Sequence, residues 1–277
     1  EAFERDRFVV VPDVLTDAEI DRVAAATDRA VAVRKRSDHR ALAQKSRYEQ
    51  SFVQCINLWE DHTEVRPLTF HANVARLAAE LLRTPAVRLW HDQALYKEPG
   101  GRTTDAHQGQ PYWPIAEPDT VTAWVPFDGS ALERGAMGYL PGSHRLGVSR
   151  FINIFGDQEP ESLLDHGEFA DIEPVFVEVP RGGVAFHHGY TVHTAHPNLG
   201  TTTRRVHTMI YFRDGCTRGS PAFHFSVDRP GIAVGEPIRS DVTPIAWPRA
   251  ANDLPETPPP LSPALRELLP PGLVAEA

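Results

Sequence analysis

Hydrophobic residues near the N-terminus follow first a strand pattern and then a helical one. The run "FVVVP" (8–12) is β-branched, which favours a short strand. In "LTDAEIDRVAAATDRAV" (15–31), Thr16 and Glu19 have the spacing of a capping box. The residues after this box that recur at helical spacing are Ile20, Val23, Ala24, Thr27 and Val31. We therefore predict a strand and then an amphipathic helix with this stripe on a core. A second such helix is predicted at 73–83, where Val74, Leu77 and Leu81 share one side.

Most of the remaining chain carries strand patterns separated by Pro and Gly turns. In 120–129 the alternation is clear, because four apolar residues fall on one face: Val121, Ala123, Val125 and Phe127. Thr122, Trp124 and Pro126 fall on the other face. Segment 171–198 predicts two strands around a Gly-Gly turn. The other segments that we interpret as extended, or as a strand with a turn, are 47–60, 86–101, 135–145 and 204–215.

Two helices followed by many short strands predict a mainly β fold with flanking helices. The spacing is typical of a double-stranded β-helix, or jelly roll, with the helices packed on one face. No interior domain boundary is evident, so we expect a single domain over 1–277. Its C-terminal tail, from about residue 254, is Pro-rich ("LPETPPPLSPALRELLPPG", 254–272) and is expected to wrap the domain.

Composition removes several classes of function. The formal net charge of −9 argues against a nucleic-acid polymer as partner, because phosphate neutralisation needs a basic face. It also disfavours an acidic carrier protein. No apolar run approaches the roughly 20 residues of a membrane span, and the charged start "EAFERDRF" does not look like a signal peptide. Cys55 and Cys216 match no zinc or disulfide spacing, so a cytoplasmic setting is expected.

Two of the thirteen histidines are candidates for a metal site. His107 follows a Gly-Gly break, and His193 lies in a histidine-rich strand segment (187–196) far along the chain. Facing strands of a jelly roll can bring them together, and imidazole is a good ligand for iron, zinc or copper. His187 and His188 are adjacent on a predicted strand, so at most one of them points inward.

The motifs around these histidines resemble a known enzyme family. "LYKEPGG" (95–101) and "HQGQPYWP" (107–114), then "MGYLPGSHRLG" (137–147), "GGVAFHHGYTVHTAHPN" (182–198) and "RRVHTMIYF" (204–212), are similar in order and spacing to the phytanoyl-CoA dioxygenase family of Fe(II)/2-oxoglutarate-dependent oxygenases. The resemblance implies a jelly roll that uses O2. It also implies His107 and His193 as iron ligands and Arg204, 11 residues after His193, as the clamp for the distal carboxylate of 2-oxoglutarate. Arg205 is the alternative if the register is shifted by one residue.

The sequence departs from the family pattern at position 109, where Gly replaces the aspartate of the two-His-one-carboxylate triad. The change removes one iron ligand and one negative charge, and a chloride ion restores that charge. Here the chain resembles the aliphatic halogenase branch of the superfamily, in which Gly or Ala replaces the aspartate and chloride binds iron. Two other interpretations of Gly109 stay open: an ordinary turn glycine, and a change from aspartate in a hydroxylase.

Further side chains near these motifs are candidates for binding the cosubstrate or the substrate. The residues proposed for 2-oxoglutarate, besides Arg204, are Lys97, Thr104, Gln108 and Trp124. The residues proposed for the substrate are Gln54, Asn57, Gln93, Tyr112 and Trp113. The three amides lie in otherwise apolar strands, and a buried amide needs a partner that a bound molecule can supply.

The function predicted from the sequence is therefore Fe(II)/2-oxoglutarate-dependent halogenation of an unactivated aliphatic carbon. A small polar natural-product precursor, either a nucleotide or a free amino acid, is the expected substrate. The basic segment 39–50 is interpreted either as a solvated loop or as a lid over an anionic group. A hydroxylase of the same fold and a non-catalytic jelly-roll binding protein are the alternatives.

Overall fold

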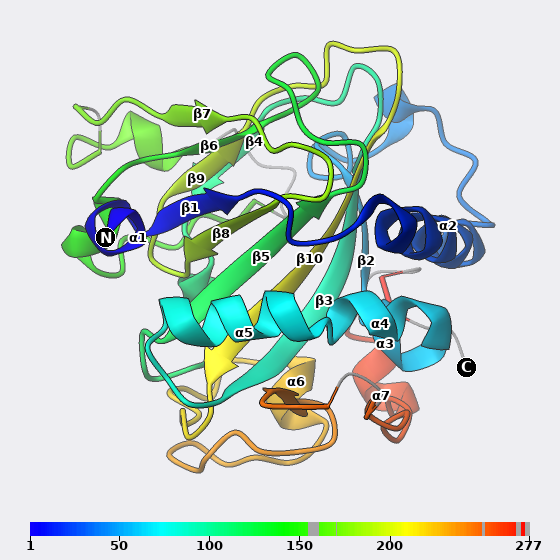
Figure 1. The fold of residues 1–277 in the computed structure, drawn as a ribbon, viewed down its shortest axis with the longest axis vertical. Helices are drawn as coiled ribbons and strands as arrows, with labels where there is room; N and C mark the ends of the chain where they lie inside the picture. Colours follow the sequence, from blue (N-terminus) through cyan, green and yellow to red (C-terminus); the bar gives the residue numbers. More distant parts are fainter. Residues whose placement is uncertain (155–160, 170, 251–252, 270–272, 275–277) are drawn as a thin grey trace.

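Two antiparallel sheets form the framework of the protein, for which a computed structural model describes residues 1–154, 161–169, 171–250, 253–269 and 273–274 (Figure 1). Within this part of the chain, the larger sheet has seven strands in the order β1 (Phe8–Val11), β8 (Val184–His188), β5 (Thr120–Pro126), β10 (Arg204–Arg213), β3 (Val87–Lys97) and β11 (Ile245–Trp247), with β2 (Val53–Ile56) also paired to β3. The smaller sheet has the order β4 (Thr104–His107), β9 (His193–Ala195), β6 (Met137–Tyr139) and β7 (Val175–Val177). The predicted mainly β jelly roll is confirmed.

Helices and short helical turns connect the strands. The α-helices are α1 (Ala2–Asp6), α2 (Asp17–Arg34), α3 (Leu58–Asp61), α4 (Arg66–Thr69), α5 (Ala72–Leu81), α6 (Phe225–Asp228) and α7 (Pro263–Arg266). The 3₁₀ turns are η1 (Leu42–Gln44), η2 (Thr63–Val65), η3 (Gln110–Tyr112), η4 (Ser143–Leu146) and η5 (Leu163–Asp165). None of the helices in the described residues is long and apolar enough to cross a membrane.

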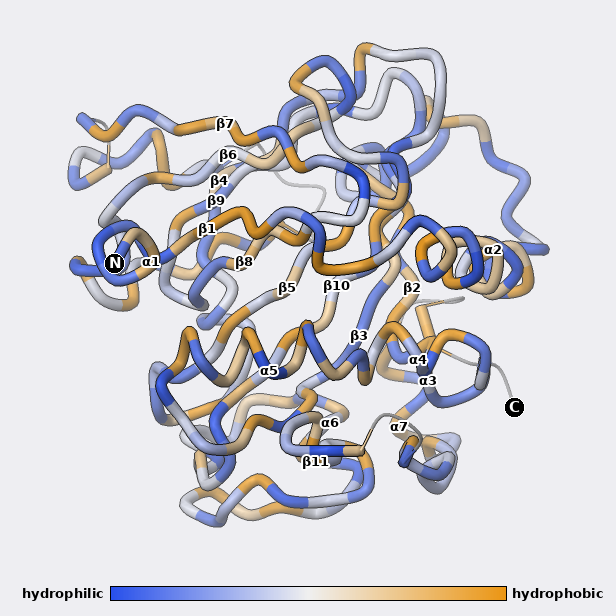
Figure 2. Tube along the Cα trace, viewed as in Figure 1, coloured by the Kyte–Doolittle hydropathy of each residue, from blue (hydrophilic) through white to orange (hydrophobic). Residues whose placement is uncertain are grey.

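Both predicted helices are present, and they cover one face of the larger sheet (Figure 1). The helix α2 begins after the predicted capping box, in which the Thr16 N–H donates to Glu19 at 2.8 Å and the Glu19 N–H donates to the Thr16 hydroxyl at 3.3 Å. In α5 the buried side consists of Val74 and three alanines, while Leu77 and Leu81 are only partly buried. Figure 2 shows how apolar and polar positions alternate along α2 and α5.

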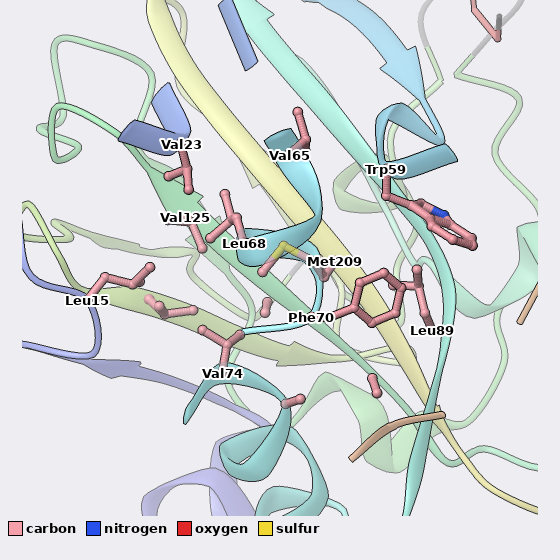
Figure 3. Close-up of a cluster of buried hydrophobic side chains, with 14 of the residues drawn as sticks. Leu15, Val23, Trp59, Val65, Leu68, Phe70, Val74, Leu89, Val125 and Met209 are labelled. Carbon is pink, nitrogen blue, oxygen red and sulfur yellow. The ribbon is translucent and has the colours of Figure 1, made fainter. Parts of the chain in front are cut away.

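The main core lies between these helices and the sheet. The four apolar residues predicted on one face of 120–129 are fully buried there, three of them in β5 and Phe127 just after it. Leu89 of β3 and Met209 of β10 are fully buried in the same core. Figure 3 shows Met209 and Val125 close to Leu68 of α4. This packing fixes the position of the larger sheet, so that its opposite face is free to line the interior of the jelly roll.

Two predicted segments differ from the structure. Segment 47–60 is not extended throughout: only Val53–Ile56 is a strand, and Leu58–Asp61 forms a helical turn. The change of direction occurs at Asn57, whose φ of 55° puts it in the left-handed region that asparagine tolerates. Segment 171–198 contains three strands rather than two, because a turn after His188 separates β8 from β9.

The described part of the C-terminal tail packs on the domain. The Arg66 guanidinium donates to the Pro255 carbonyl at 2.9 Å, and Leu261 and Val274 join a small apolar cluster with Ile56. Residues 270–272 of the predicted tail lie outside the described residues. That 1–277 is a single domain stays a prediction.

Candidate metal centre

The two candidate histidines lie side by side in the smaller sheet. His107 is the last residue of β4 and His193 is the first of β9, and the two are directly opposite in the antiparallel register. Their ring centroids are 4.3 Å apart. The fold therefore brings together two imidazoles that are far apart in the sequence, as a shared metal ion requires.

Both imidazoles are held in the tautomer that suits a metal ligand. Nδ1 of His107 donates to the Asp105 carbonyl at 2.8 Å, and Nδ1 of His193 donates to the Thr191 carbonyl at 2.9 Å. Because a carbonyl only accepts, the hydrogen is on Nδ1 and the lone pair on Nε2 is free, as in most histidine metal sites. Burial lowers the pKa of both imidazoles below the ordinary value, which favours the neutral, ligating form.

Gly109 lies beside this pair and leaves the third ligand position without a side chain. Its φ of −76° and ψ of −42° are ordinary helical values that any L-residue adopts, so the backbone does not require glycine. A Cβ at this position would lie 2.9 Å from Cη2 of Trp113. A larger residue at position 109 would therefore clash with the Trp113 indole, but it would not strain the backbone.

No protein group completes a conventional triad in the described residues. Nowhere in that part of the chain do three or more His, Cys, Asp or Glu side chains cluster so that they could hold a metal ion. His187, whose ring centroid lies 4.4 Å from that of His193, faces the same cavity, whereas His188 does not line it. This agrees with the expectation that at most one of the two points inward.

A buried arginine faces the same cavity from β10. Arg204 donates to the Gly135 carbonyl at 2.6 Å, and its guanidinium lies over the Trp124 ring at 5.3 Å. Its Nε has no partner in the described residues. Burial lowers the pKa of this guanidinium to about 9. A buried cation with a free N–H fits the carboxylate of a bound acid, and Thr104 lines the cavity as well.

Comparison with known proteins shows which family the chain belongs to. The sequence model described as phytanoyl-CoA dioxygenase matches residues 3–206. The chain belongs to the phytanoyl-CoA dioxygenase family. Curated relatives include the phytanoyl-CoA dioxygenase domain-containing protein 1 of Rattus norvegicus, 30% identical over 163 residues, which are 56% of this chain and 55% of that protein. A probable alpha-ketoglutarate-dependent hypophosphite dioxygenase of Stutzerimonas stutzeri is 29% identical over 128 residues, 45% of each chain. The chain thus spans about half the length of these relatives.

Solved structures of similar fold cover more of the chain. The non-heme alpha-ketoglutarate-dependent carbocyclase SnoK from nogalamycin biosynthesis is 26% identical, with a TM-score of 0.73 over 88% of this chain and 93% of that one. The epimerase SnoN, in complex with Fe3+, alpha-ketoglutarate and nogalamycin RO, is 25% identical, with a TM-score of 0.71 over 88% and 96%. A family site with iron and the 2-oxoglutarate cosubstrate agrees with the histidine pair and the buried arginine described above.

The structure places the two candidate arginines of this family motif on opposite faces of β10. Arg205 points away from the cavity and pairs with Asp28 at 2.6 Å and Asp128 at 2.7 Å. Arg204 faces the cavity and has no carboxylate partner in the described residues. This geometry favours Arg204, and its role as the 2-oxoglutarate clamp stays a prediction.

Three of the sequence candidates do not line the cavity, which corrects our expectation for them. Lys97 is fully buried and donates to the Arg102 carbonyl, and burial next to Arg204 lowers its pKa to about 6. The Gln108 amide makes three hydrogen bonds to backbone groups of residues 147, 149 and 190. Asn57 forms the turn after β2. The Lys97 and Gln108 side chains therefore bind backbone groups around the site, whereas Oδ1 of Asn57 has no partner in the described residues.

The other candidates do face the cavity. Tyr112 packs edge-on to His107 in the smaller-sheet part of the site, with centroids 5.8 Å apart. Trp124, Gln54 and Gln93 line the cavity from β5, β2 and β3 of the larger sheet, and Thr104 lines it from β4. Trp113 also lines the cavity. The roles assigned to these residues stay predictions.

Sequence reasoning missed several residues of the cavity wall. His91 lies two positions before Gln93 on β3 and so shares its face, a signal that strand alternation contains. Tyr48 and His224 come from connecting segments, and no local pattern points to them.

Proposed function

We propose that this protein is an Fe(II)/2-oxoglutarate-dependent halogenase that chlorinates an unactivated aliphatic carbon. The observation that supports it is Gly109, which has an ordinary helical backbone, no side chain, and a position two residues after His107. In the described residues no carboxylate takes the place of the missing one. A monoanionic halide restores the charge that the aspartate of the family pattern would supply.

The residues present fit the cofactors of this chemistry. The Nε2 atoms of His107 and His193 would hold Fe(II), since their Nδ1 atoms are already used. Arg204 would bind the distal carboxylate of 2-oxoglutarate, for which its unpartnered Nε is a ready donor. Iron, 2-oxoglutarate and O2 together supply an oxidant able to take a hydrogen atom from an unactivated C–H bond.

The side chains around Gly109 would position the substrate and limit the access of water to it. Tyr112 is fixed beside His107 by a hydrogen bond from its hydroxyl to the Ile152 carbonyl at 2.5 Å. Trp113 and Tyr112 line the cavity next to Gly109. These rings would hold a substrate beside Gly109, and positioning of this kind would favour halogenation over hydroxylation.

The direct test is whether a halide binds the iron. The protein is loaded anaerobically with Fe(II), 2-oxoglutarate and sodium bromide, and the iron-edge X-ray absorption is measured. We expect a heavy scatterer in the first shell that is absent when bromide is omitted. A first shell of light atoms alone, with iron and 2-oxoglutarate bound, would contradict the proposal.

Two substitutions at position 109 separate charge from size. Gly109→Asp supplies a carboxylate and is expected to abolish the bromide signal. Gly109→Ala adds only the Cβ, with the same 2.9 Å approach to Trp113, and is expected to keep the signal if the indole gives way. Loss of the signal in both variants would show that space beside Trp113, and not the charge at position 109, controls the halide.

Products distinguish the halogenase from its alternatives. Replacement of hydrogen by chlorine supports the proposal, whereas addition of one oxygen supports a hydroxylase of the same fold. A protein that binds no metal at His107 and His193 and forms no succinate from 2-oxoglutarate would be a non-catalytic binding protein.

A further inference from the structure

The cavity that contains the histidine pair is much larger than the metal centre. Its volume is about 800 Å³, near the upper end of the roughly 300–1,000 Å³ typical of small-molecule sites. Away from the histidines much of its wall is apolar, with both aromatic and aliphatic side chains. The side chains that form this outer part include Phe52, Val53, Phe151, Ile154, Phe223 and Leu269. A free amino acid would leave most of this surface uncovered.

The outer walls come from segments that connect the strands and from the C-terminal tail. Phe52 precedes β2, Phe151 follows η4, Phe223 precedes α6, and Leu269 follows α7. Connecting segments on a rigid sheet framework are where binding specificity usually lies. The wall that they form here suits flat rings, because aromatic side chains pack well on them.

The segment 39–50 does not offer free positive charge for a phosphate. Its basic side chains Arg40, Lys45 and Arg47 each pair with a carboxylate of this chain. A nucleotide would have to displace these partners. The paired charges therefore disfavour the interpretation of 39–50 as a lid over an anionic group such as the phosphate of a nucleotide.

A hydrogen-bonded group of polar side chains lies within the wall, apart from the charged residues Lys35, Asp38, Lys45 and Glu49 that also line the cavity. The Tyr48 hydroxyl donates to Oε1 of Gln54 at 2.5 Å, and Nε2 of Gln54 donates to Oε1 of Gln93 at 2.5 Å. The two glutamines lie on the adjacent strands β2 and β3. This chain of hydrogen bonds uses the carbonyl oxygen of Gln93 and leaves its amide N–H groups without a partner in the described residues.

We propose that the substrate is a bulky, mainly apolar ring compound with a carbonyl oxygen, and that Gln93 donates a hydrogen bond to this oxygen. The Tyr48–Gln54–Gln93 chain fixes the direction of the donor, and the aromatic walls hold the rings. The inference rests on the proposed function only in that this compound would be the molecule that is halogenated. Binding of the ring compound needs no turnover.

The test compares two flat probes of equal ring number, 9,10-anthraquinone and anthracene, with AMP and L-leucine as small polar probes. Binding to the full chain with 2-oxoglutarate and Zn(II) is followed by quenching of tryptophan fluorescence. We expect saturable binding of anthraquinone, about 10-fold tighter than that of anthracene, as one hydrogen bond to a carbonyl provides. AMP and L-leucine are expected not to saturate.

Gln93→Glu tests the donor with little change of shape. The carboxylate still accepts from Gln54 but cannot donate, so anthraquinone should lose its 10-fold preference while anthracene binding stays the same. The matched control is Gln44→Leu, an exposed glutamine outside the cavity, which should change neither. Affinity for 2-oxoglutarate, measured in parallel, should not change in either variant.

Three results would overturn the inference: equal binding of anthraquinone and anthracene, saturable binding of AMP or L-leucine in preference to both, or no binding of either ring probe. A Gln93→Glu variant that loses 2-oxoglutarate instead would assign Gln93 to the cosubstrate. The bromide experiment is independent, so its failure together with anthraquinone binding would remove the halogenase but keep the ring substrate.

Discussion

The two faces of the larger sheet are both buried, but by different partners. On β10, Met209 and Tyr211 point to the helices and lie in a continuous apolar core. Arg204 and Thr208, on the other face of the same strand, point into the cavity. On β5, Val125 likewise packs in the core under the helices, and Trp124 points into the cavity.

This difference indicates which buried polar residues are candidates for binding a ligand. On the cavity face no layer of apolar side chains covers the polar ones, so a bound molecule can supply their hydrogen-bond partners. The helix face also contains a buried polar pair, His207 and Asp92, whose side chains contact each other at 3.2 Å. Asp92 Oδ1, His207 Nδ1 and Arg204 Nε each lack a partner in the described residues. Of these three atoms, only Arg204 Nε belongs to a residue that lines the cavity.

The largest effect is expected when a candidate metal ligand on the cavity face is replaced. His107→Ala removes one of two protein ligands, and affinity for Co(II), measured by calorimetry, should fall by more than the 10–100-fold typical of changes in the partners of ligands. The control His196→Ala changes a histidine that does not line the cavity and should leave the affinity unchanged. Wild-type affinity in His107→Ala would remove His107 from the metal site.

The helix face should respond in stability and not in binding. Met209→Ala is expected to lower the free energy of unfolding by about 2–5 kcal/mol, because it leaves a cavity in a fully packed core. Thr208→Val, the neighbouring residue on the cavity face, should cost less. Urea unfolding measures both, and an equal cost for the two would show that the faces do not differ as described.

The cavity face should respond in binding and not in stability. Arg204→Lys replaces the planar guanidinium, and we expect affinity for 2-oxoglutarate to fall about 10- to 100-fold, or about 1.4–2.7 kcal/mol. Arg205→Lys is the matched control on the opposite face, where the side chain pairs with Asp28 and Asp128. If Arg205→Lys had the larger effect on affinity, our choice between the two arginines would be wrong.

The smallest effect concerns Lys97, which is buried behind Arg204. Its pKa is lowered from 10.5 to about 6 by burial and by Arg204, so between pH 6 and 10.5 the unfolded chain binds a proton that the folded protein does not. The free energy of unfolding therefore gains up to about 1.4 kcal/mol per pH unit from this group as the pH rises. In Lys97→Met that gain should disappear from urea titrations at pH 7 and 8. An unchanged pH dependence would mean that Lys97 stays charged in the fold.

The sequence alone predicted most of the elements and proposed the two candidate metal ligands. Helix α2, its capping box and the alternation of β5 depend on residues close together in the chain, so their patterns are visible without the fold. The histidines and Gly109 were found by resemblance of ordered motifs. Their pairing across β4 and β9 was an expectation that needed the sheet to form.

Only the tertiary structure decided which side chains share the cavity. Strand alternation places Gln93 and Gln108 on faces, but it does not show that one meets Gln54 and the other meets the backbone of a distant loop. The sequence also does not show which of Arg204 and Arg205 faces the cavity, or how large the cavity is. Both depend on contacts between segments that are remote in sequence, and local patterns of polarity do not encode which remote segments meet.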